Sequence, residues 1–139
     1  MEITYTDRIA VDDYNLLRAS AGWPQICPEQ AQAGLNGSVF MTVAKDGAKT
    51  VGMARLVTDG GYIAYIADVL VLPEYQRRYI GTELMNRVMA NVRERRKDGY
   101  QIHLVLMSAK GKESFYKQFG FVKRPDDHFG CRMSQWLSE

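Results

Sequence analysis

The chain of 139 residues is the size of one domain, and its composition, 46% hydrophobic and 24% charged, is that of a globular rather than a disordered protein. Eighteen Lys and Arg against 16 Asp and Glu leave a formal charge of +2, too balanced to indicate a nucleic-acid partner. No apolar run approaches the ~18 residues of a membrane span, and the N-terminus lacks the pattern of a signal peptide. We expect a soluble, cytoplasmic single domain over residues 1–139, with Cys27 and Cys131 reduced.

The first half of the sequence predicts helices followed by an antiparallel meander. Asp46-Gly47 is the kind of pair that closes a hairpin, and Asp59-Gly60-Gly61 marks a second turn. The segments around these turns are rich in apolar residues. The expected elements are a strand over Glu2–Thr6, helices over Val11–Ala19 and Pro28–Leu35, and strands over Ser38–Ala44 and Lys49–Thr58.

The second half predicts a buried strand, a long helix and a parallel return strand. Tyr62 to Leu72 is apolar apart from Asp68 and does not alternate, which is typical of a strand covered on both faces. Between Arg77 and Lys97, apolar residues recur at helical spacing. The remaining expected elements are a strand over Ile102–Met107, a helix over Lys112–Gln118, and strands over Phe121–Arg124 and Cys131–Trp136. Together these elements predict a mixed α/β sheet with a crossover helix.

The connection between the buried strand and the long helix is the most informative stretch. The first N–H groups of a helix have no intrahelical acceptor, and the helix dipole is positive there. Arg77 and Arg78 add two charges at this point, and Gly81 permits close approach of backbone. These features predict a site for a phosphate or pyrophosphate. A solvated, basic helix start with a packing glycine is the alternative, and the residue types alone leave both open.

Two segments resemble motifs of the GNAT acetyltransferases. Pro-Glu-Tyr-Gln-Arg-Arg-Tyr-Ile-Gly-Thr, residues 73–82, resembles motif A, which reads Q/R-x-x-G-x-G/A after a strand ending V-x-P. Ser-Phe-Tyr-Lys-Gln-Phe-Gly-Phe, residues 114–121, resembles the F-Y-x-x-x-G-F signature of the same family. The two motifs stand in the family's order, separated by a helix and a strand. With the preceding hairpins, the resemblance covers nearly the whole chain from about Ser38.

The resemblance implies six or seven mixed strands flanked by about four helices, with acetyl-coenzyme A (acetyl-CoA) as cosubstrate and no metal. It also implies that the pantetheine arm pairs with the backbone of Val69, Leu70 and Val71, and that the pyrophosphate contacts Arg77, Arg78, Tyr79, Ile80, Gly81 and Thr82. Tyr116 stands where the family carries its usual general acid, which protonates the departing thiolate. The alternative for Tyr116 is an aromatic side chain that packs its helix on the sheet.

The sequence departs from the family pattern at two positions that bear on function. Tyr79 replaces the first motif glycine, which puts cofactor affinity in question, although a tyrosine can still donate its N–H if its side chain points away. In the buried strand, Ala67-Asp68 stands where some relatives that act on small amines carry Glu-Asp. A carboxylate in an apolar strand must be paired or face a cavity. Asp68 is therefore a candidate general base or ammonium ligand, or else a carboxylate satisfied by backbone N–H groups at a strand irregularity.

The function that this resemblance implies is the transfer of an acetyl group from acetyl-CoA to a primary amine by direct attack. Catalysis would rest on Tyr116 and Asp68, and a small amine is a better candidate acceptor than a protein. A non-catalytic module that binds acyl-CoA, as a sensor or subunit, is the competing hypothesis. We expect neither a nucleic acid nor a membrane as partner. A homodimer stays open, because dimers are common among similar proteins.

Overall fold

The computed structural model describes residues 2–137, and its strands form one five-stranded sheet. The strands lie side by side in chain order: β1 (Ile3–Thr6), β2 (Phe40–Asp46), β3 (Lys49–Thr58), β4 (Ile63–Val71) and β5 (His103–Leu106). Neighbours from β1 to β4 are antiparallel, whereas β5 is parallel to β4. The predicted mixed sheet is confirmed, and β3 has the bounds that the sequence predicts.

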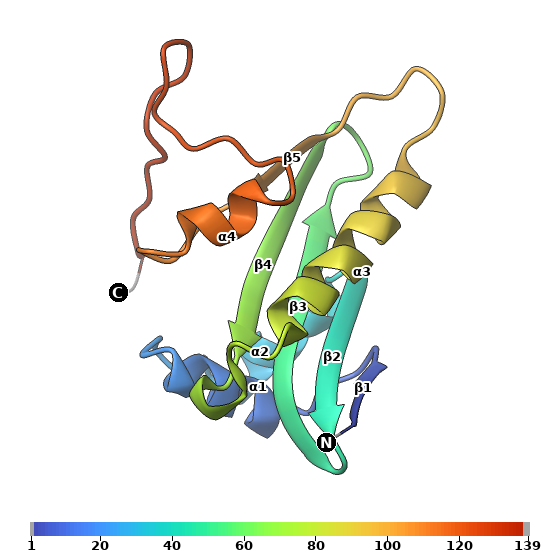
Figure 1. The fold of residues 1–139 in the computed structure, drawn as a ribbon, viewed down its shortest axis with the longest axis vertical. Helices are drawn as coiled ribbons and strands as arrows, with labels where there is room; N and C mark the ends of the chain where they lie inside the picture. The colour runs from blue at the N-terminus through green and yellow to red at the C-terminus, as the bar shows by residue number, and fades with distance from the viewer. Residues whose placement is uncertain (1, 138–139) are drawn as a thin grey trace. The chain divides into compact units, whose positions relative to one another are not determined.

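The chain divides into two compact units after Leu106 (Figure 1). The first unit contains the sheet together with α1 (Val11–Ser20), α2 (Pro28–Asn36), the 3-10 turn η1 (Pro73–Tyr75) and α3 (Ile80–Arg95). The second unit contains α4 (Glu113–Lys117) and a long irregular segment. Within residues 2–137 no helix is long and apolar enough to cross a lipid bilayer.

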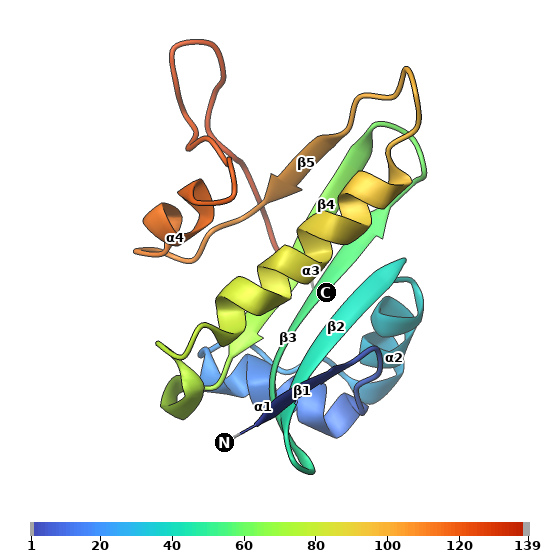
Figure 2. The same cartoon turned by 45° about the vertical axis from the view of Figure 1, so that its right-hand side comes forward.

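Helices cover both faces of the sheet in the first unit. Figure 2 shows α3 lying across one face, with α1 and α2 behind the sheet on the other. The position of α3 follows from its sequence, because a buried apolar residue recurs every four positions at Ile80, Leu84, Val88 and Val92. Pro28 begins α2 at the first helical position, where its missing N–H removes no hydrogen bond.

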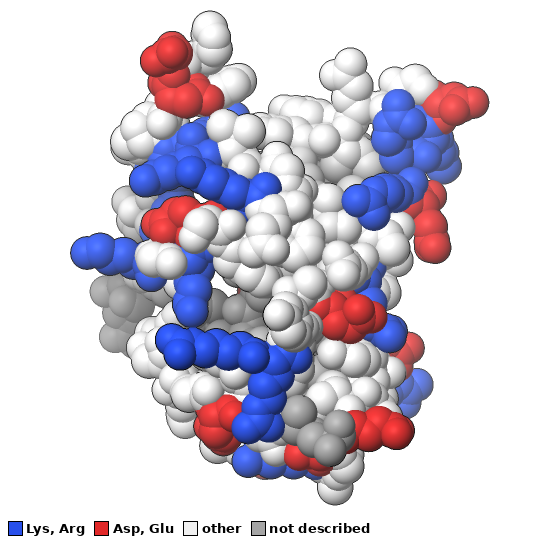
Figure 3. All heavy atoms as spheres, viewed as in Figure 1, with Lys and Arg blue, Asp and Glu red and all other residues white. Residues whose placement is uncertain are grey.

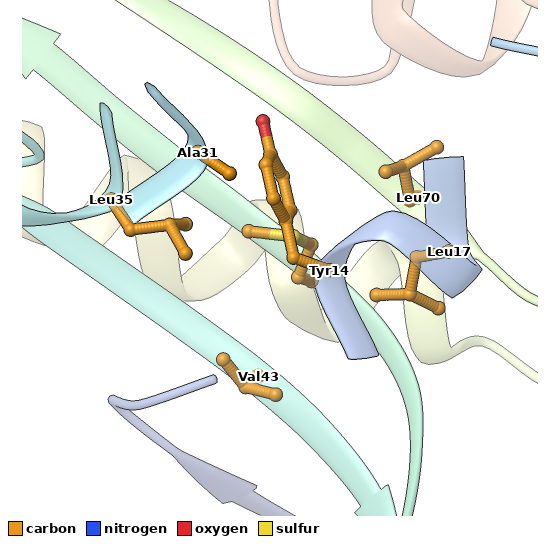
Figure 4. Packing of buried hydrophobic residues seen from close by; sticks show 7 residues of the cluster. Tyr14, Leu17, Ala31, Leu35, Val43 and Leu70 are labelled. Atoms are coloured by element: carbon orange, nitrogen blue, oxygen red, sulfur yellow. The ribbon is translucent and has the colours of Figure 1, made fainter. Parts of the chain in front are cut away.

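The core between the sheet and the two N-terminal helices is a compact apolar cluster (Figure 4). It joins α1 and α2 to β2, β3 and β4 through the following buried residues: Tyr14, Leu17, Ala31, Leu35, Val43, Met53 and Leu70. Tyr14 is the member with a polar end, and Figure 4 shows its hydroxyl oxygen at the far tip of a ring that lies among the apolar side chains. The Tyr14 hydroxyl donates a hydrogen bond to Asp68, a residue of the candidate site.

The second unit differs from the sequence prediction. Residues 121–124 and 131–136 were expected to complete the sheet as strands, but no strand is present between positions 107 and 137. The sheet of the described chain therefore has five strands, not six or seven. These segments have the composition of strands, yet they join no strand ladder among the described residues. Three of their large apolar residues lie open to solvent, with Val122 74%, Met133 92% and Trp136 78% exposed, whereas Phe121 is half-buried.

Candidate active site

The C-terminal half of β4 has a free hydrogen-bonding edge among the described strands. β5 pairs only with the first part of β4, from Ile63 to Ile66. The edge of Val69, Leu70 and Val71 that faces away from β3 therefore has no strand beside it, and Figure 1 shows β5 ending well before β4 does. An exposed row of backbone N–H and C=O groups can pair with an extended ligand.

A β-bulge sits at the start of this free segment. Arg55 on β3 lies opposite Ala67 and Met53 lies opposite Leu70, so Ala54 faces two residues on β4, Asp68 and Val69. Asp68 adopts a left-handed backbone conformation, with φ 55°. This is the conformation that glycine usually supplies in bulges of this kind, and aspartate is among the few other residues that tolerate it.

The carboxylate of Asp68 lies in a buried cluster of four charged or polar side chains. The Tyr14 hydroxyl and the Arg55 Nε each donate to Oδ2 at 2.6 Å, and Arg18 Nη1 donates to Oδ1 at 3.3 Å. The side chains of Asp68 and Arg18 are each 8% exposed and that of Arg55 is 16% exposed. Among the described residues, every buried side-chain nitrogen or oxygen has a hydrogen-bond partner.

This environment changes the ionisation of two of the partners. Burial first, and then the hydrogen bond to Asp68, raises the pKa of Tyr14. Burial acts to lower the pKa of Arg55, but the hydrogen bond and the negative charge of Asp68 outweigh it, so the pKa of Arg55 is raised. The shifts therefore favour a neutral Tyr14 phenol and a charged Arg55 guanidinium beside the carboxylate. The irregularity anticipated at Asp68 is present, and side chains rather than backbone N–H groups satisfy its carboxylate.

The loop that follows β4 places basic residues at the start of α3. Arg77 and Tyr79 both adopt left-handed conformations, each with φ 63°. Tyr79 is the residue before the helix, its carbonyl accepts the N–H of Glu83 at 3.0 Å, and its side chain is 83% exposed. The N–H groups of Ile80, Gly81 and Thr82 precede the first intrahelical bond. Figure 3 shows basic side chains gathered over this connection between β4 and α3.

Two residues of this loop that the sequence analysis did not assign hold it in place. Gln76 Nε2 donates to the carbonyl of Val71 at 3.0 Å, at the end of the free segment. The Tyr75 hydroxyl donates to Asp46 Oδ2 at 2.6 Å, and the Arg78 guanidinium lies over the Tyr75 ring at 5.2 Å. Gln76 could have been singled out because it fills the first position of motif A. Nothing in the local sequence indicates the partner of Tyr75.

Tyr116 lies in the second unit, on α4, and is buried. Its ring packs edge-on against Phe115 and Phe121, with centroid separations of 5.1 and 6.4 Å. Burial raises the pKa of Tyr116 to about 12, so the phenol keeps its proton at neutral pH. The packing with aromatic neighbours supports a structural role for Tyr116. The retained proton is compatible with a role as general acid.

An open cavity of about 600 Å³ lies elsewhere, between α1 and the start of α2. Its lining includes Asp12, Asn15 and Leu16 from α1. Asp12 and Leu16 lie on a different side of the helix from Tyr14 and Arg18, which face the core. None of the four side chains of the Asp68 cluster lines the cavity, and we assign it no part in the site.

Comparison with known proteins agrees with this arrangement. The acetyltransferase (GNAT) domain profile matches residues 10–131. An uncharacterised N-acetyltransferase, ycf52, of Porphyra purpurea is 27% identical over 129 residues, which span 89% of this chain and 71% of that protein. Its counterpart in Pyropia yezoensis is 30% identical over 112 residues, which span 77% of this chain and 62% of that protein.

A solved structure shows the same fold. It belongs to a Staphylococcus aureus protein of unknown function described as a probable acetyltransferase, and it superposes with a TM-score of 0.86 at 26% identity, covering 96% of this chain and 100% of the other. The chain belongs to the GNAT family of acetyltransferases.

Proposed function

We propose that the protein transfers an acetyl group from acetyl-CoA to a primary amine, with a small amine as acceptor. The observation that carries the proposal is the free edge of β4 at Val69–Val71, which leads through a basic loop to the start of α3. An extended amide-bearing arm needs such an edge, and a pyrophosphate needs such a helix start. The two features stand in the order in which the two parts of acetyl-CoA follow one another.

The loop residues fit the pyrophosphate despite the tyrosine at position 79. A glycine in motif A allows a left-handed backbone, and Tyr79 adopts that backbone with its side chain directed into solvent. The N–H groups of Tyr79, Ile80, Gly81 and Thr82 are therefore the proposed donors. Arg77 and Arg78 supply the positive charge. Val69, Leu70 and Val71 supply backbone groups for the pantetheine amides.

The proposed reaction is direct attack of a neutral amine on the thioester carbonyl carbon. The new C–N bond forms as the C–S bond breaks, the thiolate takes a proton from Tyr116, and the amine loses one proton to a base. A thiolate of pKa about 8.5 is a good leaving group, so modest assistance suffices. Backbone N–H groups near Val71 are the proposed donors to the carbonyl oxygen, and positioning of the two reactants supplies much of the remaining acceleration.

The proposed assignment of Asp68 as general base or ammonium ligand is weakened by its contacts. Both carboxylate oxygens already accept hydrogen bonds from fixed, buried donors. A base must have a lone pair within reach of the proton that it takes. The contacts of Asp68 therefore favour a structural role at the strand irregularity, with side-chain donors in place of the expected backbone N–H groups.

Thermal unfolding with acetyl-CoA, and separately with CoA, tests the cofactor site. A ligand present at 100 times its Kd stabilises the folded state by about 2.7 kcal/mol, which raises the Tm by several degrees. Arg78→Glu should abolish most of the rise, whereas Arg87→Glu, which exchanges the same charge on the body of α3, should leave it intact. The absence of a rise with the native protein at millimolar ligand would refute the proposal.

A thiol-release assay then separates an enzyme from a module that only binds acyl-CoA. Small primary amines and a peptide with a free N-terminus and a lysine are the acceptors to screen. Tyr116→Phe should reduce kcat about 100-fold if the phenol protonates the thiolate, the low end of general-acid effects. An unchanged kcat across pH 6–9 would remove Tyr116 from the mechanism. Binding of acetyl-CoA without turnover of any acceptor would favour the non-catalytic module.

A further inference from the structure

The carboxylate of Asp68 joins segments that lie far apart in the chain. Its hydrogen-bond donors come from α1, through Tyr14 and Arg18, and from β3, through Arg55. Its own backbone forms the bulge that begins the free segment of β4. One side chain therefore ties the proposed pantetheine-binding strand to the helix layer on the other side of the core.

The two arginines extend these connections to both ends of α2. Arg18 Nε donates to the Pro24 carbonyl at 2.9 Å, and its guanidinium lies over the Trp23 ring at 5.4 Å. Arg55 Nη1 donates to the Gly34 carbonyl at 3.2 Å and to the Ser38 Oγ at 3.1 Å. The connection that precedes α2, residues 21–27, is therefore linked to β4 through Arg18, which donates to the Pro24 carbonyl and to the Asp68 carboxylate.

The connection over residues 21–27 is also held to α1 by a reciprocal pair of hydrogen bonds. Asn15 Nδ2 donates to the Ile26 carbonyl at 2.9 Å, and the Ile26 N–H donates to the Asn15 Oδ1 at 3.0 Å. The α1 helix thus presents Asn15 to one end of the connection and Arg18 to the other. A shift of Arg18 must therefore move or strain this segment, because Asn15 fixes it at a second point.

Position 68 requires a residue that tolerates the left-handed backbone and whose side chain can bind both arginines. Aspartate meets both requirements. Glycine would take the left-handed backbone without strain, but it has no side chain to anchor. A neutral asparagine tolerates the same backbone, but it has one acceptor oxygen in place of two and no negative charge to offset the two arginines. The left-handed conformation is the less favourable one for a residue with a side chain, so the surrounding contacts must hold it.

We propose that Asp68 is a positioning residue that fixes the bulge in β4, and with it the direction of the Val69–Val71 backbone, and that couples this segment to residues 21–27 through Arg18. The consequence for acetyl-CoA rests on the proposed function, because it assumes that the pantetheine arm pairs with Val69–Val71. The coupling itself is a property of the protein without ligand.

Amide hydrogen exchange of the unliganded protein tests the coupling directly. Asp68→Asn should speed exchange at least about tenfold at Leu72, whose N–H donates to the Val51 carbonyl at 2.9 Å, at Leu70 on the same side of β4, and at residues 21–27, because these segments lose a shared anchor. The β1–β2 ladder should not change. Asp13→Asn is the matched control, since it removes one carboxylate from α1 that accepts a hydrogen bond from Thr50 at 2.9 Å. Unchanged exchange at Leu70 and Leu72 in Asp68→Asn would overturn the proposal.

Arg18→Lys keeps the test decisive if Asp68→Asn does not fold. Arg18 reaches Asp68 and the Pro24 carbonyl at the same time because its guanidinium is a planar fork of donors. A lysine has no such fork and cannot make both hydrogen bonds. Exchange should therefore increase at residues 21–27 and, more weakly, at Leu70 and Leu72 on β4. An increase confined to residues 21–27 would show that the connection is anchored without being coupled to β4, which contradicts the proposal.

Binding of acetyl-CoA, measured calorimetrically, extends the test to the site. Asp68→Asn should raise the Kd about tenfold or more, because the backbone edge is no longer held in one direction. Val92→Ala, at the far end of α3, lowers stability without touching the bulge and should leave the Kd within about twofold. Equal Kd values for Asp68→Asn and the native protein would overturn the positioning role. Failure of the native protein to bind acetyl-CoA would instead refute the proposed function and leave the exchange result standing.

Discussion

The bulge at Asp68 and the loop at Tyr79 place non-glycine residues in the same left-handed conformation, with φ of 55° and 63°, but their side chains are treated in opposite ways. Asp68 is buried and accepts three hydrogen bonds, whereas the Tyr79 ring is largely exposed. At the bulge, long-range contacts hold the backbone. At the loop, the turn and the start of α3 hold it. Substitutions should therefore have large effects at the first position and small effects at the second.

The largest expected effect follows the loss of the anchor. Asp68→Ala leaves the buried guanidinium groups of Arg18 and Arg55 without their counter-charge, which should lower the free energy of unfolding by about 3–5 kcal/mol. Urea unfolding measures this difference. Asp13→Ala, on the same helix as Arg18, should lower it by about 1 kcal/mol. A loss below about 1 kcal/mol for Asp68→Ala would mean that the arginines find other partners, and the contrast between the two positions would fail.

The second expected effect concerns the spacing of the strands beside the bulge. Gly52 on β3 lies opposite Val71, and a Cβ at this position would lie 2.9 Å from the carbonyl oxygen of Leu70. Because backbone cannot yield as a side chain does, Gly52→Ala should lower stability by about 1–3 kcal/mol. Gly37→Ala is the control, since its nearest contact would be at 3.4 Å. Equal stability of the two variants would show that β4 can move away from β3.

The third expected effect depends on pH and on the Tyr14 contact. The pKa of Tyr14 is raised from 10.0 in the folded protein, so its contribution to stability is complete below pH 10 and is lost as the pH rises through the folded-state value. Tyr14→Phe should lower stability by about 1 kcal/mol at pH 7 and should reduce the further loss above pH 10. Tyr75→Phe, which removes a more exposed hydroxyl–carboxylate contact of the same 2.6 Å length, should show a smaller change at pH 7. A steeper alkaline loss in Tyr14→Phe would contradict this reasoning.

The difference between local and long-range contacts also explains which features the sequence could predict. Helical spacing at Ile80, Leu84, Val88 and Val92 and the hairpin signal at Asp46-Gly47 are local, and each element of the first unit formed within a few residues of its expected bounds. The segments over 121–124 and 131–136 show the limit of such patterns, because apolar composition does not specify which strand will pair with them. The strand count was wrong for that reason.

The contacts of Asp68 were beyond prediction because they are not local. Tyr14, Arg18 and Arg55 are separated from Asp68 by 54, 50 and 13 residues. A signal was nevertheless present, since Arg18 follows Leu17 on the buried side of α1 and Arg55 interrupts an apolar strand. Two basic residues and one acidic residue in buried positions must be satisfied within the fold, and the simplest solution is that they meet.

The smallest expected effect is at Tyr79. Replacement by glycine relieves about 1–2 kcal/mol of left-handed strain, but glycine also gains freedom in the unfolded chain, which offsets roughly 0.5–1 kcal/mol. Tyr79→Gly should therefore stabilise the protein by less than about 1 kcal/mol and change the Kd for acetyl-CoA less than about threefold. Tyr79→Ala removes the ring but keeps the strain, so it separates the two causes. If both variants tightened binding equally, the ring rather than the backbone would be restricting the site. If only Tyr79→Gly tightened binding, the left-handed strain of the Tyr79 backbone would be limiting the affinity for acetyl-CoA. The backbone conformation would then matter at Tyr79 as it does at Asp68, and the two positions would differ less than expected.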